Sequence, residues 1–240
     1  MTLALLLAPS SARALVEGSY SYSVSGGQAT IIGFNKAYSG PLDIPATLGG
    51  FPVTAIGPNA FYSANGITDV TIPAGVATIN TCAFRFCANL QTIAIPASVQ
   101  VIGGGVFDDC YSMESITVDE SNPSFSSVQG VLYNKVRTTL LKVPCGRSGS
   151  FVLPEGLTGL SSSAFAACRK LTSLAIPADF KGVIVGIFFR TCNALATFSV
   201  DPANPVYSVG ESGELVNKAQ IRLVRLPPAF TVEARSRGMA

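Results

Sequence analysis

The chain has 240 residues, of which 48% are hydrophobic and only 12% are charged, and its formal net charge is +2. No block of basic residues occurs, so binding to nucleic acid or to an anionic membrane surface is not indicated. The absence of histidine excludes Ser-His-Asp and Cys-His catalysis. No run of residues approaches the roughly 18 consecutive apolar residues of a membrane-spanning helix.

The N-terminal segment, residues 1–14, contains the apolar run LALLLA and ends with small residues at Ala12 and Ala14. That ending is typical of a secretory signal peptide cleaved after Ala14, although no Lys or Arg precedes the apolar run. We expect residues 1–14 to be the remnant of a signal peptide. The alternative is an apolar N-terminus without that role.

Residues 15–41 alternate apolar and polar side chains on either side of Gly26-Gly27. This alternation predicts two strands joined at the glycines, which would form a β cap for the segment that follows.

A phrase with a period of 23 residues then recurs from about residue 42 to residue 200, and its clearest copy is AFRFCANLQTIAIPASVQVI at residues 83–102. Its aromatic anchors are Phe61, Phe84, Phe107, Phe165 and Phe189, and its cysteine anchors are Cys87, Cys110, Cys168 and Cys192. Such a period is typical of a solenoid, in which each coil buries apolar residues only against its neighbours. We therefore expect the anchor residues to be buried.

Each copy of the phrase predicts one strand. In QTIAIP, alternation sends Ile93 and Ile95 to one face of the strand and Thr92 and Ala94 to the other. The AF..C..L part is too short for an independent helix, and it favours one or two helical turns on the opposite side of the coil.

Two segments interrupt the period, residues 122–144 and 204–227. Each predicts two strands about a turn, at Asn134-Lys135 and at Asn217-Lys218, and so a β-hairpin insertion. The repeat ends after Phe230. We expect residues 231–240 to be an irregular tail. Because a solenoid needs a cap over its last coil, either this tail is a poor cap or the chain is a fragment, and we favour the fragment.

The segments AIGPNAF, TINTCAFRFCANLQTIAIPASV and LSSSAFAACRKLTSLAIPADF resemble the BspA-like, treponemal-type leucine-rich repeat family. The resemblance covers roughly residues 41–230. It implies an α/β solenoid over residues 42–230: a right-handed coil with a parallel strand face, short helical turns opposite, and β-hairpin insertions. It also implies a secreted or surface-exposed protein that binds host components, matrix or other cells, with no shared catalytic residues.

Other patterns that suggest chemistry have simpler explanations. Gly103–Gly105 lacks the Lys-Ser/Thr of a phosphate-binding loop and fits a repeat turn. Asp108 and Asp109 are adjacent carboxylates, for which a solvated turn is favoured over an acid/base pair. The segments VDESNP and VDPANP are compatible with calcium, but turn formation by Asp and Asn before Pro accounts for them. We expect no catalytic residue, cofactor or metal.

The four in-phase cysteines are expected to be small buried thiols, because their shared phase points them inwards. A disulfide between Cys87 and Cys110 is the alternative, with awkward geometry because the two Cβ vectors are parallel. Cys82 and Cys145 are out of phase, so exposure of these two is an open alternative.

The remaining candidate site is the outward face of the strands, which carries small uncharged side chains. Its residues are Thr71, Thr92, Ala94, Ser115, Thr117, Ser173, Ala175, Thr197 and Ser199. Solenoids use such faces for extended contacts, although Thr and Ser are also ordinary solvent-facing strand residues.

We therefore expect a non-catalytic, secreted or cell-surface adhesion protein. Its partner would be an extracellular protein or a glycan, not nucleic acid. The alternative function is a structural spacer in a larger surface protein.

Overall fold

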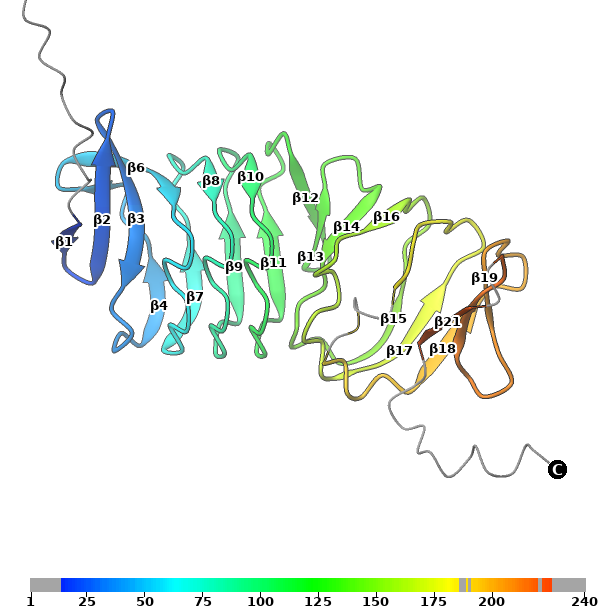
Figure 1. Cartoon of the computed structure of the whole chain (residues 1–240). Helices are drawn as coiled ribbons and strands as arrows, with labels where there is room; N and C mark the ends of the chain where they lie inside the picture. Colours follow the sequence, from blue (N-terminus) through cyan, green and yellow to red (C-terminus); the bar gives the residue numbers. More distant parts are fainter. Residues whose placement is uncertain (1–13, 186–188, 190, 220–221, 226–240) are drawn as a thin grey trace, which may run out of the picture.

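A computed structural model describes residues 14–185, 189, 191–219 and 222–225. These residues form a solenoid whose coils stack along one axis (Figure 1). The predicted tail at residues 231–240, and all but Ala14 of the predicted signal-peptide remnant, lie outside the described residues. Within the described part of the chain, no helix is long and apolar enough to cross a membrane.

The N-terminal end of the solenoid is an antiparallel meander. Its strands are β1 (Leu15–Glu17), β2 (Tyr20–Ser25) and β3 (Gln28–Phe34). Gly26 and Gly27 both have positive φ, 57° and 73°, as the tight turn between β2 and β3 requires. β3 pairs in parallel with β6 (Phe51–Ile56), so the meander continues directly into the first coil. The short strand β5 (Thr47–Leu48) pairs with β6 in the antiparallel orientation.

Three regular coils follow, which we call the first (residues 51–73), second (74–96) and third (97–119). Each coil contributes one strand to each of two parallel sheets. The first sheet contains β4 (Gly40–Asp43), β7 (Ile67–Thr71), β9 (Thr92–Ile95) and β11 (Ser115–Val118). The second continues from β6 through β8 (Thr78–Ile79) and β10 (Val101–Ile102).

The expected helical turns are wrong: the described residues contain no α-helix, and the AF..C segments are successive tight turns. The backbone explains the difference. The Phe61 N–H donates to the Ala83 carbonyl at 2.8 Å, and the Phe84 N–H donates to the Val106 carbonyl at 3.1 Å. These N–H groups bond to the next coil, so they are not available for the i→i−4 bonds of a helix.

The turns also need left-handed residues at fixed repeat positions. Asn59, Cys82 and Gly105 lie 23 residues apart, and their φ angles are 57°, 57° and 65°. Gly105 therefore belongs to the repeat turn. A positive φ is less strained for glycine than for residues with a Cβ atom. This agrees with the repeat-turn interpretation of Gly103–Gly105.

The repeat anchors form the core. Phe84, Leu90, Ile93 and Ile95 are each at most 1% exposed, as the 23-residue register predicts. The rings of Phe61 and Phe84 stack with centroids 4.8 Å apart, and those of Phe84 and Phe107 at 6.1 Å. The buried residues divide into two clusters, one extending through the third coil to Leu132 and the other beginning at Val131.

The first insertion has three antiparallel strands where the sequence suggested two. They are β12 (Phe125–Val128), β13 (Val131–Asn134) and β14 (Thr139–Lys142). The second half then continues with β15 (Gly149–Val152), β16 (Gly159–Leu160), β17 (Leu171–Ile176) and β18 (Thr197–Val200). A second three-stranded insertion contains β19 (Tyr207–Val209), β20 (Leu215–Asn217) and β21 (Arg222–Arg225).

A buried asparagine begins each insertion. The Asn122 side-chain amide donates to the carbonyls of Pro96 and Val99, both at 2.8 Å, and its oxygen accepts from the N–H groups of Ser124 and Phe125. Asn204 makes the same four bonds in the second insertion. Because every polar atom of both amides has a backbone partner, these segments act as turns. No cluster of three metal-binding side chains occurs among the described residues.

The cysteines form a ladder along the core. The Cys87 thiol lies 3.1 Å from the Phe61 carbonyl, and the Cys110 thiol lies 3.1 Å from the Phe84 carbonyl. Cys145 continues this ladder at 3.7 Å from the Phe107 carbonyl and is 1% exposed, so the insertion places it in phase despite its spacing in the sequence. Cys82 is half-buried, and no disulfide joins any two of the six cysteines.

We predict that Phe84→Ala lowers the free energy of unfolding by about 3–5 kcal/mol, because it removes a buried ring and leaves a cavity between coils. Urea denaturation followed by circular dichroism measures the change. Thr71→Ala, at an exposed position in β7, should change it by less than about 0.5 kcal/mol. Equal effects of the two substitutions would contradict the assignment of the core.

The cysteine ladder predicts sensitivity to alkaline pH. Burial raises the pKa of Cys87 from 9.0 to about 12, so the folded state holds a proton that the unfolded state loses. Stability from this thiol is complete below pH 9 and declines as pH rises toward 12, by about 1.4 kcal/mol per pH unit. Cys87→Ala should flatten the fall in unfolding free energy between pH 9 and 11. Val99→Ala, which also opens a buried site, should leave the slope unchanged.

Candidate binding surface

The predicted strand face occurs in the first sheet with the register that the repeat implies. Thr71 pairs across from Ala94, and Ala94 from Thr117, so the three side chains form a column over β7, β9 and β11. All three are exposed, as is Thr92. Thr92 lies across from Ser115, which is half-buried.

The second half presents a separate panel of the same kind. Ser173 pairs with Thr197 and Ala175 with Ser199 over β17 and β18. Thr197 and Ser199 are exposed, whereas Ser173 and Ala175 are half-buried. The first insertion lies between the two panels, because the Ile116 N–H donates to the Gly130 carbonyl at 2.9 Å and the Val118 N–H to the Ser127 hydroxyl at 3.0 Å. The nine predicted residues therefore form two groups rather than one continuous column.

The strand face offers hydroxyl and methyl groups on a rigid backbone. Neighbouring strands lie about 4.8 Å apart, so the side chains form shallow, regularly spaced ridges. Few of the hydroxyl groups on this face are held by hydrogen bonds within the protein. The Thr92 hydroxyl donates to Asp69, and the Thr117 hydroxyl contacts the Ile93 carbonyl at 3.4 Å. Such a surface suits extended contact with a partner rather than bond-making chemistry.

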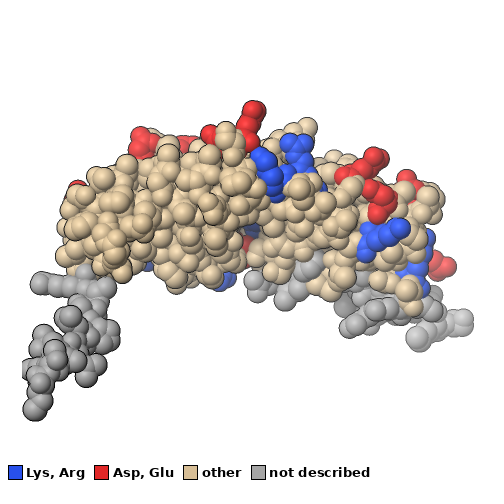
Figure 2. Space-filling model, turned by 90° about the horizontal axis from the view of Figure 1, so that it is seen from above, with Lys and Arg blue, Asp and Glu red and all other residues tan. Residues whose placement is uncertain are grey.

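Charged side chains are unevenly distributed over the solenoid. Figure 2 shows a broad face almost free of Lys, Arg, Asp and Glu, with charged groups along its edge and toward the C-terminal half. Because only 12% of the residues are charged, long stretches of surface can contact an uncharged partner without desolvating ions.

A ridge of aromatic and charged side chains, which was not predicted from the sequence, lies on the turn side of the solenoid. Arg85 lies 4.9 Å from the Phe86 ring and 3.4 Å from Asp109. Tyr111 donates to Asp109 at 3.1 Å, and the Arg169 guanidinium lies 3.7 Å from the Tyr111 ring. Arginine and tyrosine are enriched among residues that dominate binding energy. The signal was present in the sequence at the variable positions that follow the anchor Phe and Cys residues.

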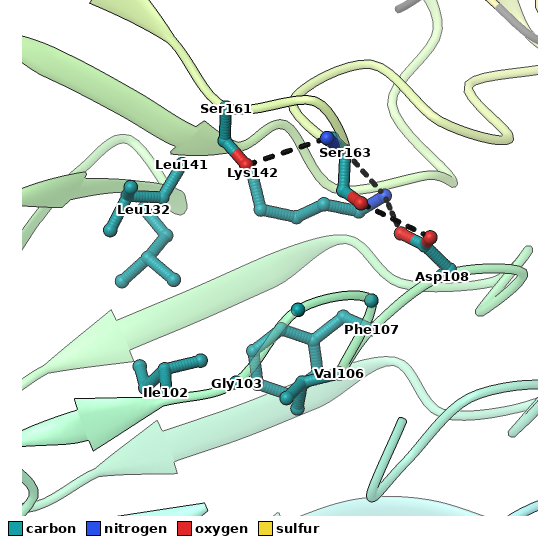
Figure 3. A pocket seen from close by; sticks show the side chains of 12 residues that line it. Ile102, Gly103, Val106, Phe107, Asp108, Leu132, Leu141, Lys142, Ser161 and Ser163 are labelled. Carbon is teal, nitrogen blue, oxygen red and sulfur yellow. Dashed lines mark hydrogen bonds and ion pairs between the residues drawn. The ribbon is translucent and has the colours of Figure 1, made fainter. Parts of the chain in front are cut away.

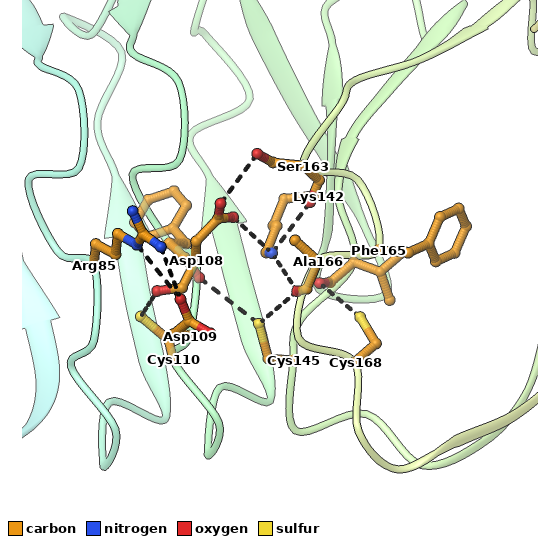
Figure 4. Close-up of polar contacts among 12 residues, drawn as sticks. Arg85, Asp108, Asp109, Cys110, Lys142, Cys145, Ser163, Phe165, Ala166 and Cys168 are labelled. Atoms are coloured by element: carbon orange, nitrogen blue, oxygen red, sulfur yellow. Dashed lines mark hydrogen bonds and ion pairs between the residues drawn. The ribbon is translucent and has the colours of Figure 1, made fainter. Parts of the chain in front are cut away.

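Asp108 corrects the expectation of a solvated turn. Its side chain is 10% exposed and pairs with the Lys142 ammonium group at 3.2 Å. Lys142 also donates to the Ala166 carbonyl at 2.8 Å and to the Ser163 carbonyl at 3.2 Å (Figure 4). This pair joins the third coil to the first insertion, at the place where the core divides into two clusters.

The charges at this junction alter one another's protonation. Burial alone lowers the pKa of Lys142, but its electrostatic interactions with Cys145, Cys168 and the Asp108 carboxylate outweigh burial and raise that pKa above its usual value. A hydrogen bond from Cys168, aided by Lys142, lowers the pKa of Cys145 to about 7 against the opposing effect of burial. The junction is thus the most polar part of the described interior.

The fold and surface define a solenoid of the leucine-rich-repeat class. A family model described as the BspA type leucine rich repeat region matches residues 52–135 and 144–227 in six copies. Since these residues make up more than half of the chain, the chain belongs to this family. No curated protein matches it significantly.

Solved structures of bacterial leucine-rich-repeat proteins are similar to this chain. The T. pallidum leucine-rich-repeat protein is 20% identical, covers 78% of this chain and 82% of its own, and gives a TM-score of 0.52. A leucine-rich cell surface protein of Faecalibacterium prausnitzii is 21% identical, covers 80% and 77%, and gives 0.40. At these identities the likeness concerns the fold alone.

We predict that Lys142→Met destabilises the protein by about 3–5 kcal/mol, because it leaves the Asp108 carboxylate buried without its cation. The double variant Asp108→Asn/Lys142→Met should lose less than Lys142→Met alone, since no unpaired charge remains. Urea denaturation of the wild type, of Asp108→Asn, of Lys142→Met and of the double variant measures the coupling free energy between the two side chains. A double variant that is as unstable as the sum of the single ones would show that the ion pair contributes nothing.

Proposed function

We propose that this protein is a non-catalytic binding module, secreted or displayed at a cell surface, that attaches to an extracellular protein or glycan. The observation that carries the proposal is the strand face, where Thr71, Ala94 and Thr117 stand in register on a rigid parallel sheet. Family membership supports it, because repeat solenoids use such extended faces for macromolecular contacts.

The physical argument concerns preorganisation. Backbone bonds between coils fix the spacing of the side chains before a partner arrives, so little conformational entropy is lost on binding. Small side chains add little rotamer entropy to that loss. The face therefore suits a partner that is itself extended and contacts several coils at once.

The test introduces two large cations on the strand face. In Thr71→Arg/Thr117→Arg, both side chains point to solvent, so the fold should persist while a close-fitting partner is excluded. Retention of the purified chain on cultured cells and on plates coated with extracellular-matrix proteins should fall at least tenfold. Circular dichroism checks that the variant is folded.

The matched control is Ala77→Arg/Gln100→Arg, which places the same charges at exposed positions on two adjacent coils outside the first sheet. It should bind as the wild type does. Normal binding by the strand-face variant would move the site elsewhere, and the ridge of Arg85, Tyr111 and Arg169 would be the next candidate. If the wild type is retained on none of these surfaces, the spacer function is favoured.

A further inference from the structure

A small pocket lies at the junction between the third coil and the first insertion, and we infer that it binds an acetamido group, as carried by N-acetylated amino sugars. The cavity has a volume of about 120 Å³. Figure 3 shows its polar wall at Asp108, Lys142 and Ser163 and its apolar wall at Leu132 and Leu141. The site is distinct from the strand face and goes beyond the function proposed above.

The pocket exists because a regular set of backbone bonds ends there. In the first coil, the N–H groups of Asn59, Phe61 and Ser63 donate to carbonyls of the second coil. In the second coil, the equivalent N–H groups of residues 82, 84 and 86 donate to carbonyls of the third. The repeat therefore directs these N–H groups toward the following coil.

In the third coil, the equivalent N–H groups have no acceptor. Those of Gly105, Phe107 and Asp109 donate to no protein atom among the described residues, and both Gly105 and Phe107 line the pocket. By the repeat, they point toward the insertion, which forms the far wall through Leu141. Phe107 is buried and Gly105 is half-buried, and N–H groups in such positions without a protein partner are satisfied by water or a ligand. The pocket thus offers two preorganised donors to a carbonyl oxygen.

On the opposite side of the pocket, the Asp108 carboxylate can accept a hydrogen bond, and the ion pair that it forms with Lys142 has no net charge. The Asp108 carboxylate accepts from Lys142 at 3.2 Å and from the Ser163 hydroxyl at 3.2 Å, and it retains capacity for a further donor. Lys142 already makes three hydrogen bonds, which use its three donors. Since the ion pair neutralises itself, a charged ligand would gain little here, whereas an N–H donor would find a carboxylate oxygen.

The apolar wall distinguishes an acetamido group from other amides. Leu132 is 1% exposed, and with Ile102 and Leu141 it lines the side of the cavity away from the ion pair. A methyl group would bury its surface there at a gain of about 25 cal/mol per Å². An acetamido group has a carbonyl oxygen for the N–H groups, an N–H for Asp108, and a methyl for this wall.

The size of the pocket accommodates this group. A cavity of about 120 Å³ is well above the roughly 10–15 Å³ that a single water molecule needs, so it has room for the four heavy atoms of an acetamido group. The ring that carries it would remain at the mouth, where Gly104 is exposed and a Cβ atom would meet nothing within 4 Å. The pocket would therefore recognise the acetamido substituent rather than the sugar ring.

The test follows the amide signals of Gly105 and Phe107 in ¹H–¹⁵N spectra of the full chain as N-acetylglucosamine is added. We expect both signals to shift in a saturable manner, because their N–H groups acquire an acceptor. Glucosamine and glucose, which lack the acetyl group, should shift them at least tenfold less at the same concentration. Free glutamine, which has an amide without the methyl, distinguishes a glycan substituent from a protein side chain.

The blocking variant is Gly104→Leu, whose side chain can enter the open mouth of the pocket. Thr81→Leu is the matched control, because Thr81 is the exposed residue at the same repeat position one coil earlier. We expect Gly104→Leu to weaken binding at least tenfold and Thr81→Leu to leave it unchanged. If Gly104→Leu fails to fold, Ser161→Leu blocks the pocket from its opposite wall.

Three results would overturn the inference: no shift at Gly105 and Phe107 with N-acetylglucosamine, equal shifts with glucose, or undiminished binding by the folded blocking variant. Stronger binding of glutamine than of the sugar would assign the pocket to a protein side chain. The strand-face variant Thr71→Arg/Thr117→Arg leaves the pocket intact, so failure of this inference and failure of the proposed function are separate outcomes.

Discussion

The hydrogen bonds between the backbones of successive coils determine most of this structure. A single coil cannot enclose its own apolar residues, so Phe61, Phe84 and Phe107 are buried only because each coil holds the next at a fixed spacing. The same bonds rule out a helix on the turn side, since the N–H groups are already used. They also fix the register in which the small side chains of the strand face are presented. Where they stop, after the third coil, the core divides and a polar cavity opens.

The sequence was sufficient to predict what depends on periodicity. Anchors such as Phe84, Leu90 and Ile93 recur with one spacing and are buried, and the pairing of Thr71, Ala94 and Thr117 follows from the same register. The family resemblance was also confirmed. A repeat specifies which residues face inwards, because every coil meets the same neighbour on each side.

The sequence was insufficient where the period is broken. Asp108 was expected in a solvated turn, but its partner Lys142 lies 34 residues later in an insertion whose packing no repeat specifies. Cys145 appeared out of phase for the same reason, because only the folded insertion brings it under the Phe107 carbonyl. The helical turns were predicted from local spacing alone, whereas bonds to the neighbouring coil decide that backbone. An insertion interrupts the candidate strand face, and its position beside β11 could not be predicted from the sequence.

The two buried asparagines have a consequence for how such proteins change in length. Asn122 and Asn204 bind only main-chain atoms, and each stands three residues after an aspartate that directly follows a strand. A junction that depends on no particular neighbouring side chain can be moved from one coil to another without redesign of its surroundings. The Asp-x-x-Asn sequence is therefore a junction at which a three-stranded unit can be joined to different coils. Recombination between coils could add, delete or relocate the three-stranded units there, and an engineer could graft a foreign loop at the same place.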